Sequence, residues 1–151
     1  DPPNRPLGSG GGAAHLLVEA WKARGGDRRF GEWLAASRKL VVHGDVGQTF
    51  LYGAKGGEMY IMGNAAGRPM INAVGSPRVV INGTALDFLA ESFMAGDPLT
   101  GGGFVILNGI QIDEDGKVVP LAEPYPGSNL FSLASGGAIY IRTYQHLWCI
   151  R

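Results

Sequence analysis

The sequence predicts an all-β solenoid, a stack of coils of about 20 residues that each contribute one short strand. The first observation is an apolar triplet that recurs along the chain and is followed, one residue later, by glycine. The second is the regular step between these glycines, which is 19 residues from 44 to 63, 20 from 63 to 83 and 26 from 83 to 109. The third is a glycine pair shortly before three triplets, at 56–57, 102–103 and 136–137. This regularity favours stacked coils over the alternative, an ordinary twisted sheet with glycine-rich turns.

Side chains of each triplet are expected to alternate between two faces of the stack. One coil cannot bury its apolar face, but stacked coils can, because each strand pairs with its copy about 4.7–4.9 Å away. The first and third residues then line the interior: Leu40 and Val42, Met59 and Ile61, Val79 and Ile81, Val105 and Leu107, Ile139 and Ile141. The middle residues face outward and are also apolar: Val41, Tyr60, Val80, Ile106 and Tyr140. We therefore expect a partner domain or the chain's own helices to cover the outer face.

A family resemblance rests on residues 44–67, which read Gly-Asp-Val-Gly-Gln-Thr-Phe-Leu-Tyr-Gly-Ala-Lys-Gly-Gly-Glu-Met-Tyr-Ile-Met-Gly-Asn-Ala-Ala-Gly. This run resembles the GXGXG domain, the C-terminal domain of the glutamate synthase alpha subunit, and is similar to a structural subunit of formylmethanofuran dehydrogenase. The resemblance spans about residues 40–142. It implies a single-stranded right-handed parallel β-helix that braces the glutaminase and FMN-bearing domains, and that carries neither the nucleophile nor the flavin.

No catalytic, cofactor-binding or metal-binding residue is predicted in this chain. The residues singled out are the glycines of the repeat, to which we assign a structural role: Gly44, Gly47, Gly53, Gly56, Gly57, Gly63, Gly67, Gly83, Gly102, Gly103, Gly109, Gly136 and Gly137.

Before the repeat, residues 1–12 are rich in proline and glycine and predict a flexible lead-in. Residues 8–13 meet the letters of a G-x-G-x-x-A phosphate loop, but no strand precedes them, so we set dinucleotide binding aside. Residues 13–38 predict a helical arm of two short helices with tryptophans on their apolar faces. This arm either caps the first coil or docks onto a neighbouring domain.

The repeat domain is expected to span residues 39–142, and its polar residues favour structural roles. Asp45 beside His43 is the nearest approach to an acid–base pair, but the simpler interpretation is that Asp45 caps backbone N–H groups at a corner. Four turn asparagines are expected to hydrogen-bond along the stack: Asn64, Asn72, Asn82 and Asn108.

Two insertions and a tail interrupt this pattern. Residues 84–96 predict a short helix, on which Asp87 and Glu91 form either a solvated face or a weak cation site. Residues 112–119 predict a hairpin-like excursion. The tail, 143–151, is apolar and suited to cap the last coil, and its His146 and Cys149 are too few ligands for zinc.

Composition excludes several classes of function. The 13 basic and 13 acidic residues balance to zero, which gives no electrostatic footprint for nucleic acid or an anionic membrane. No apolar run is long enough to span a bilayer, and the polar start is not a signal peptide. With a single cysteine and no signal, we expect a cytoplasmic protein. Only 17% of residues are charged, which suits a domain buried against others.

Three functions compete at this point. The first is a non-catalytic scaffold in a glutamate-synthase-like oxidoreductase, with other domains or subunits as partners and any FMN or iron–sulfur cluster held by them. The second is a stand-alone ligand-binding or catalytic β-helix that uses the acidic residues Asp45, Asp87, Glu91 and Asp97. The third is a structural protein that self-associates through unprotected coil ends.

Overall fold

The computed structural model describes residues 39–97, 99 and 101–151. The lead-in and the helical arm expected over 1–38 lie outside these described residues. Within them the secondary structure is β, with no helix. The strands are β1 (Lys39–Val42), β2 (Glu58–Ile61), β3 (Arg78–Ile81), β4 (Phe104–Leu107), β5 (Ile110–Ile112), β6 (Val118–Pro120), β7 (Ala138–Arg142) and β8 (Leu147–Ile150).

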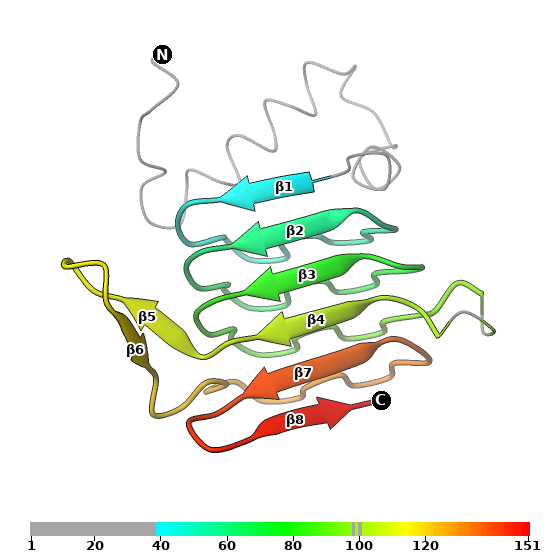
Figure 1. Ribbon diagram of the computed structural model, residues 1–151. Helices are drawn as coiled ribbons and strands as arrows, with labels where there is room; N and C mark the ends of the chain where they lie inside the picture. The colour runs from blue at the N-terminus through cyan, green and yellow to red at the C-terminus, as the bar shows by residue number, and fades with distance from the viewer. Residues whose placement is uncertain (1–38, 98, 100) are drawn as a thin grey trace, which may run out of the picture.

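A six-stranded sheet, in the order β1-β2-β3-β4-β7-β8, forms one side of the molecule (Figure 1). Its first five strands are parallel and in register, so that Lys39 lies opposite Glu58, and Glu58 opposite Arg78. The first four of these strands each open one repeat, which we number coil 1 (39–57), coil 2 (58–77), coil 3 (78–103) and coil 4 (104–137), and β7 follows coil 4 as the last parallel strand. The predicted parallel stacking of the triplets is confirmed.

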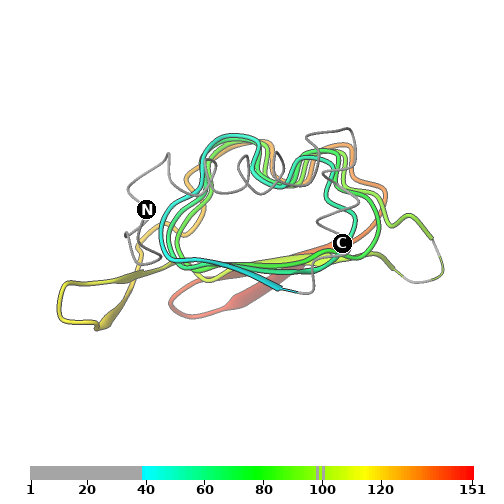
Figure 2. The ribbon, with the colours of Figure 1, turned by 90° about the horizontal axis from the view of Figure 1, so that it is seen from above.

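Opposite the sheet, the chain returns through an undulating wall. Seen along the stack, the coils superpose as a flattened oval with the sheet on one long side and this wall on the other (Figure 2). Parallel bridges join the wall segments of successive coils, from Val46 to Ala65, from Ala65 to Ala85, and from Val74 to Met94. The wall thus repeats in register with the sheet.

The undulation comes from left-handed residues that alternate along the wall. Three alternate residues in each coil have φ between +54° and +63°: Thr49, Leu51 and Gly53, then Arg68, Met70 and Asn72, then Phe88, Ala90 and Ser92, then Asn129, Phe131 and Leu133. Only one of the twelve is glycine, although this region disfavours side chains by about 1–2 kcal/mol per residue. Hydrogen bonds between coils hold the conformation. The Arg68 N–H donates to the Asp87 carbonyl in the next coil at 2.7 Å, and the Met70 N–H donates to the Phe50 carbonyl in the previous coil at 2.7 Å.

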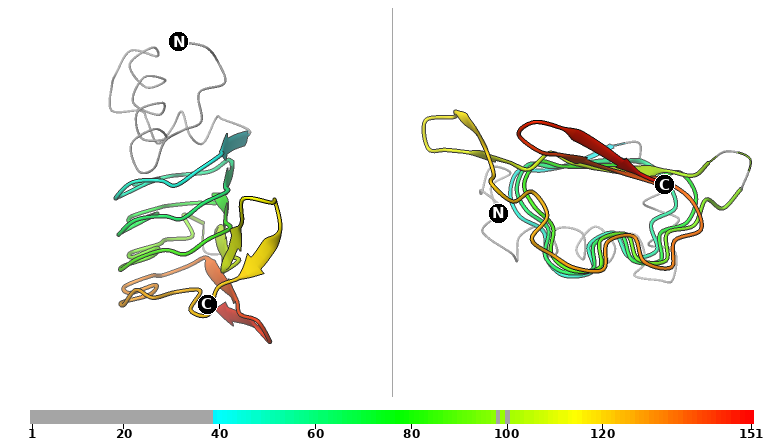
Figure 3. Two further views of the ribbon diagram at one scale, coloured as in Figure 1. Left: turned by 90° about the vertical axis from the view of Figure 1, so that its left-hand side faces the viewer. Right: turned by 90° about the horizontal axis from the view of Figure 1, so that it is seen from below.

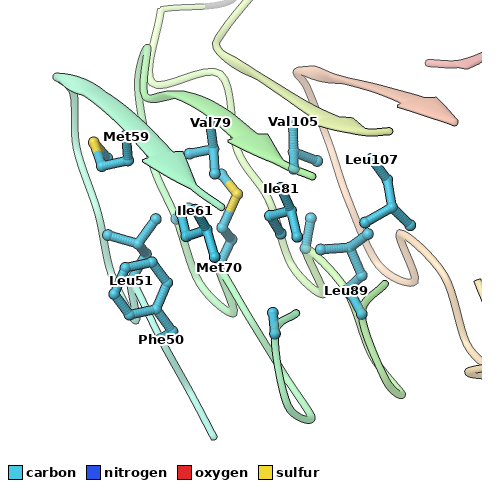
Figure 4. Close-up of a cluster of buried hydrophobic side chains, with 14 of the residues drawn as sticks. Phe50, Leu51, Met59, Ile61, Met70, Val79, Ile81, Leu89, Val105 and Leu107 are labelled. Carbon is cyan, nitrogen blue, oxygen red and sulfur yellow. The ribbon is translucent and has the colours of Figure 1, made fainter. Parts of the chain in front are cut away.

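The space between sheet and wall is filled by apolar side chains (Figure 4). From the sheet come the first and third triplet residues, which are buried as predicted, except that Leu40 is only partly buried. From the wall come Phe50, Leu51, Met70, Leu89 and Phe93, all buried. Because each coil adds one layer to both sides, the core is a continuous column that runs the length of the stack.

The helix predicted over 84–96 is wrong. Leu86 and Met94, which the helical spacing places with the core, are 47% and 38% exposed. The backbone N–H groups of alternate residues bond to neighbouring coils: that of Phe88 donates to the Ser128 carbonyl, and that of Ala90 donates to the Pro69 carbonyl, both at 2.9 Å. The segment is one more layer of the wall, and its stacking between two other layers overrides the local helical pattern.

The predicted hairpin is confirmed. Strands β5 and β6 pair antiparallel and project from the stack at the end of β4 (Figures 1 and 3). The segment expected as a tail contains β8, which pairs antiparallel with β7 at the end of the sheet. No helix in the described part of the chain is long and apolar enough to cross a membrane.

Two of the recurring glycines occupy positions where coils approach closely. A Cβ at Gly63 would lie 2.7 Å from the carbonyl carbon and 2.8 Å from the carbonyl oxygen of Gly44 in the coil before. A Cβ at Gly83 would lie 2.9 Å from the Gly63 carbonyl oxygen. A side chain here would point along the stack, where the spacing between coils leaves no room for it.

Candidate functional site

The corner that follows each sheet strand carries a column of polar side chains, which we call the corner ladder: Asp45, Asn64 and Thr84. Asp45 Oδ1 accepts the Asn64 N–H at 2.7 Å, and Asn64 Oδ1 accepts the Thr84 N–H at 2.8 Å. The predicted capping role of Asp45 is confirmed, although the N–H group belongs to the next coil. The bonded carboxylate and amide oxygens therefore connect each coil to the next one.

The other turn asparagines also bond between coils. Asn108 Nδ2 donates to Asn82 Oδ1 at 2.8 Å, and Asn82 Nδ2 donates to the Met62 sulfur at 3.5 Å. Asn72 Nδ2 donates to the Tyr52 hydroxyl at 3.3 Å. The expectation that these side chains connect successive coils is confirmed.

An open groove of about 450 Å³ separates the corner ladder from the projecting hairpin. We call it the hairpin groove, and it is lined by Asp45, Met62, Gly63, Asn64, Thr84, Ile110, Gln111, Ile112 and Leu121. Its floor is the polar ladder, and its outer wall is β5 with apolar side chains. Such a mixture of apolar surface and a few directed polar groups is typical of binding sites.

A second groove, of about 340 Å³, lies beside the C-terminal strand. Its lining is Gly101, Gly102, Gly103, Phe104, Gly137, Ala138, Tyr140 and Arg151. Hydrogen bonds to Tyr140 and to Cys149 raise the pKa of the Arg151 guanidinium. The guanidinium, which is positively charged at neutral pH, is one of the groups that line this groove.

Asp87 lies on the outside of the wall and is held by the next coil. It accepts the Ser128 N–H at 2.7 Å and the Ser128 hydroxyl at 3.0 Å, and these bonds lower the pKa of the carboxyl. The Tyr125 hydroxyl donates to the Ser128 carbonyl at 3.0 Å. Burial raises the pKa of Tyr125, since the phenolate would lose hydration.

The four acidic residues of the catalytic alternative do not converge. Asp45 belongs to the corner ladder and Asp87 to the wall, and Asp97 Oδ1 accepts the Leu99 N–H at 2.9 Å. Glu91 differs, because its buried Oε2 has no hydrogen-bond partner within the described part of the chain, and the same is true of the Ser132 hydroxyl. Among the described residues, no group of three or more His, Cys, Asp or Glu is placed to hold a metal ion.

The remaining sequence candidates stay apart. Asp45 accepts a hydrogen bond from the backbone of Asn64, and no hydrogen bond joins it to His43 among the described residues. The His146 ring lies edge-on to Trp148 at 5.8 Å, and Cys149 is exposed. The phosphate-loop letters at 8–13 lie outside the described residues.

Sequence reasoning missed the hairpin groove. Its apolar wall comes from Ile110, Ile112 and Leu121, which the sequence pattern assigns only to an excursion from the stack. The signal was present, because the asparagine–glycine pair at 108–109 precedes an alternating Ile-Gln-Ile segment. The direction in which the hairpin leaves the stack is not contained in that pattern.

Comparison with known proteins identifies a family. The model of the GXGXG motif family matches residues 32–148, which extends beyond the 40–142 span of the resemblance and takes in the first two residues of β8. Domains of this family occur in multidomain oxidoreductases, among them glutamate-synthase-like enzymes. No curated protein and no solved structure matches the chain significantly.

Proposed function

Because the chain belongs to the GXGXG motif family, we propose that it is a non-catalytic structural domain of a glutamate-synthase-like oxidoreductase. In this role it braces neighbouring catalytic domains or subunits. We further propose that the stacked coils wind as a right-handed single-stranded β-helix. In this proposal the recurring glycines have a structural role in the turns of the β-helix. Any FMN or iron–sulfur cluster belongs to the partner domains, and the assembly is cytoplasmic.

The observation that carries the proposal is the outer face of the sheet. Its central column is apolar through all five parallel strands: Val41, Tyr60, Val80, Ile106 and Tyr140. Val41 is exposed and the other four are half-buried, so the column is accessible along the length of the sheet. A continuous, accessible apolar column is typical of a docking face.

The polar residues support the same conclusion. Asp45, Asn64 and Asp87 accept backbone N–H groups of the adjoining coil, so their side chains stabilise the stack itself. The bonds from Ser128 favour the ionised form of Asp87 by lowering the pKa of its carboxyl, so this side chain is a poor general acid at neutral pH.

The test uses the parent polypeptide. Val80→Glu places a charge in the centre of the outer face, while Leu133→Glu places the same charge on the exposed side of the wall as a matched control. We expect Val80→Glu to release a flavin-bearing partner subunit in size-exclusion chromatography with absorbance detection, or to let limited proteolysis separate a flavin-bearing domain of the same polypeptide, and Leu133→Glu to retain either one. Both purified domains should keep the circular dichroism spectrum of the wild type.

Two results would contradict the proposal. One is a wild-type protein that purifies without any flavin or iron–sulfur partner. The other is loss of activity, with folding retained, when Asp45, Asp87, Glu91 and Asp97 are replaced by alanine, which would favour the catalytic alternative.

A further inference from the structure

Strand β5 has a backbone edge that β6 does not use. The Asp113 N–H donates to the Lys117 carbonyl at 3.0 Å, and the Leu121 N–H donates to the Gly109 carbonyl at 2.8 Å. In an antiparallel pair the residues between such bonded positions direct their N–H and C=O groups away from the partner strand. Ile110 and Ile112 are those residues, so their backbone groups face the opposite side.

This edge already pairs with the stack at its base. The Ile110 N–H donates to the Asn82 carbonyl in coil 3 at 2.8 Å. Ile112 is the next residue along the same edge, and it lines the hairpin groove. Among the residues that the structure describes, no strand pairs with this edge beyond Ile110, so the groove offers an open strand edge next to the corner ladder.

The side chains around the groove fit an extended peptide. Met62, Ile112 and Leu121 give apolar contacts, while Asn64 and Gln111 give amide groups. The volume of about 450 Å³ lies within the range of about 300–1,000 Å³ that ligand sites occupy. In strand addition, main-chain hydrogen bonds supply affinity and alternate side-chain pockets supply specificity, and both elements are present here.

Charge selects the kind of peptide. Asp45 is the only charged residue among those that line the groove. The hairpin tip next to it carries three acidic residues, Asp113, Glu114 and Asp115, against one lysine, Lys117. A basic occupant complements this surface, and an acidic one is repelled.

The hairpin itself lacks a covered face. Ile112, Val118 and Val119 are 44%, 53% and 40% exposed, and the two strands stand away from the stack (Figure 3). A two-stranded hairpin is marginally stable in water, and a third strand gives it the partner it needs.

We propose that the hairpin groove binds an extended segment of a neighbouring protein domain, which adds as a strand to the free edge of β5 and presents a lysine or arginine to Asp45. This binding goes beyond the bracing role. The proposal rests on the proposed function in one respect, which is that the bound segment belongs to a neighbouring domain. The groove and the outer face of the sheet are separate surfaces.

The experiment titrates the full chain with a six-residue peptide in which valine and lysine alternate. Binding is measured from changes in the backbone amide chemical shifts in NMR spectra of the protein. Two control peptides have glutamate in place of lysine, or N-methylated valines that cannot donate backbone hydrogen bonds. We expect the lysine peptide to shift the amides of Ile112, Asn64 and Thr84 at millimolar concentration. Neither control peptide should do so.

Protein variants locate the site. Ile112→Pro removes the N–H group of the free edge without removing a bond to β6, because that N–H points away from β6. Val118→Pro is the matched control, since it removes an N–H group from the opposite edge of the hairpin. Asp45→Asn removes the charge while its side-chain oxygen can still accept the Asn64 N–H. We expect about tenfold weaker binding for Ile112→Pro and for Asp45→Asn, and unchanged binding for Val118→Pro.

Several outcomes overturn the proposal. One is that the lysine peptide causes no chemical-shift changes in the wild type. Another is that the glutamate peptide or the N-methylated peptide binds as tightly as the lysine peptide. Equal binding by Ile112→Pro and the wild type also counts against it. Concentration-dependent shifts at β5 without peptide, together with a dimer in sedimentation, would assign the groove to a second copy of the chain. The test of the bracing role with Val80→Glu does not depend on any of these results. Failure of the peptide-binding proposal can therefore be distinguished from failure of the bracing role.

Discussion

Replacing Gly63 by alanine tests whether the recurring corner glycines are required by close approach of the coils. The new Cβ would lie 2.7 Å from the Gly44 carbonyl carbon. Ordinary carbon–carbon contacts are about 3.5–4.0 Å, so the two coils would have to separate by about 1 Å at this corner. Gly53 provides the matched control, because a Cβ there meets nothing within 4 Å, although its φ is +63°.

The expected cost follows from the bonds at the corner. The Gly63 N–H donates to the Gly44 carbonyl at 3.1 Å, and the Asn64 N–H donates to Asp45 at 2.7 Å. Separation by about 1 Å removes both, at about 1 kcal/mol each, and overpacking adds about 1–3 kcal/mol. We therefore expect Gly63→Ala to lower the free energy of unfolding by about 3–5 kcal/mol. For Gly53→Ala, left-handed strain of about 1–2 kcal/mol is partly offset by the lower entropy of the unfolded chain, which leaves about 1 kcal/mol.

The assay is urea unfolding of both variants and the wild type, followed by circular dichroism at about 25 °C. A loss of stability in Gly53→Ala that equals or exceeds that in Gly63→Ala would refute the reasoning. The recurring glycines would then be required for backbone conformation, as is usual in turns, and not for the close approach of coils.

Three further predictions follow from single contacts. Leu133→Gly should raise the free energy of unfolding by up to about 1 kcal/mol in the same urea assay, because Leu133 has φ +56° and is 82% exposed, so that little packing is lost. Asn108→Ala should lower it by about 1 kcal/mol, since the bond from Asn108 Nδ2 to Asn82 is lost; no change would contradict a role for this column. Asp87→Asn should be less stable than the wild type at neutral pH, because bonds from Ser128 lower the pKa of Asp87 in the folded state. That contribution is present above the unfolded-state pKa and is lost as the pH falls through the folded-state pKa, so unfolding curves of the two proteins should converge in acid.

The strand positions were predictable from the sequence because they depend on a local pattern with period two. The triplets alternate between interior and outer face, and the step between glycines sets which strand pairs with which. Asp45 was also interpreted correctly, since a short acidic side chain at a corner has few alternatives to capping a backbone N–H.

The wall could not be predicted in the same way. Phe88, Ala90 and Ser92 are left-handed, yet none is a residue type that favours this conformation. Their backbone is fixed by hydrogen bonds to coils 2 and 4. These partners lie about 20–40 residues away in the sequence, so a local sequence pattern gives no information about them. The helix expected over 84–96 failed for this reason, because the apolar spacing was compatible with a helix and only tertiary stacking excludes it.

The hairpin groove was out of reach for a related reason. The strands β5 and β6 could be recognised from alternation, but a groove requires the position of the hairpin relative to Asp45 and Asn64. That position follows from two bonds that join the base of the hairpin to the corner of coil 3, from the Ile110 N–H to the Asn82 carbonyl and from the Gly109 N–H to the Gly83 carbonyl.

The register of the stack has a consequence for how such a domain can change in length. Each coil presents the same backbone groups to the coil before it and the coil after it, so one complete coil can be duplicated or removed without altering the contacts of the others. Each duplication lengthens the molecule by one strand spacing, about 4.8 Å, and leaves its cross-section unchanged. The length of the stack is therefore set in discrete steps by the number of coils.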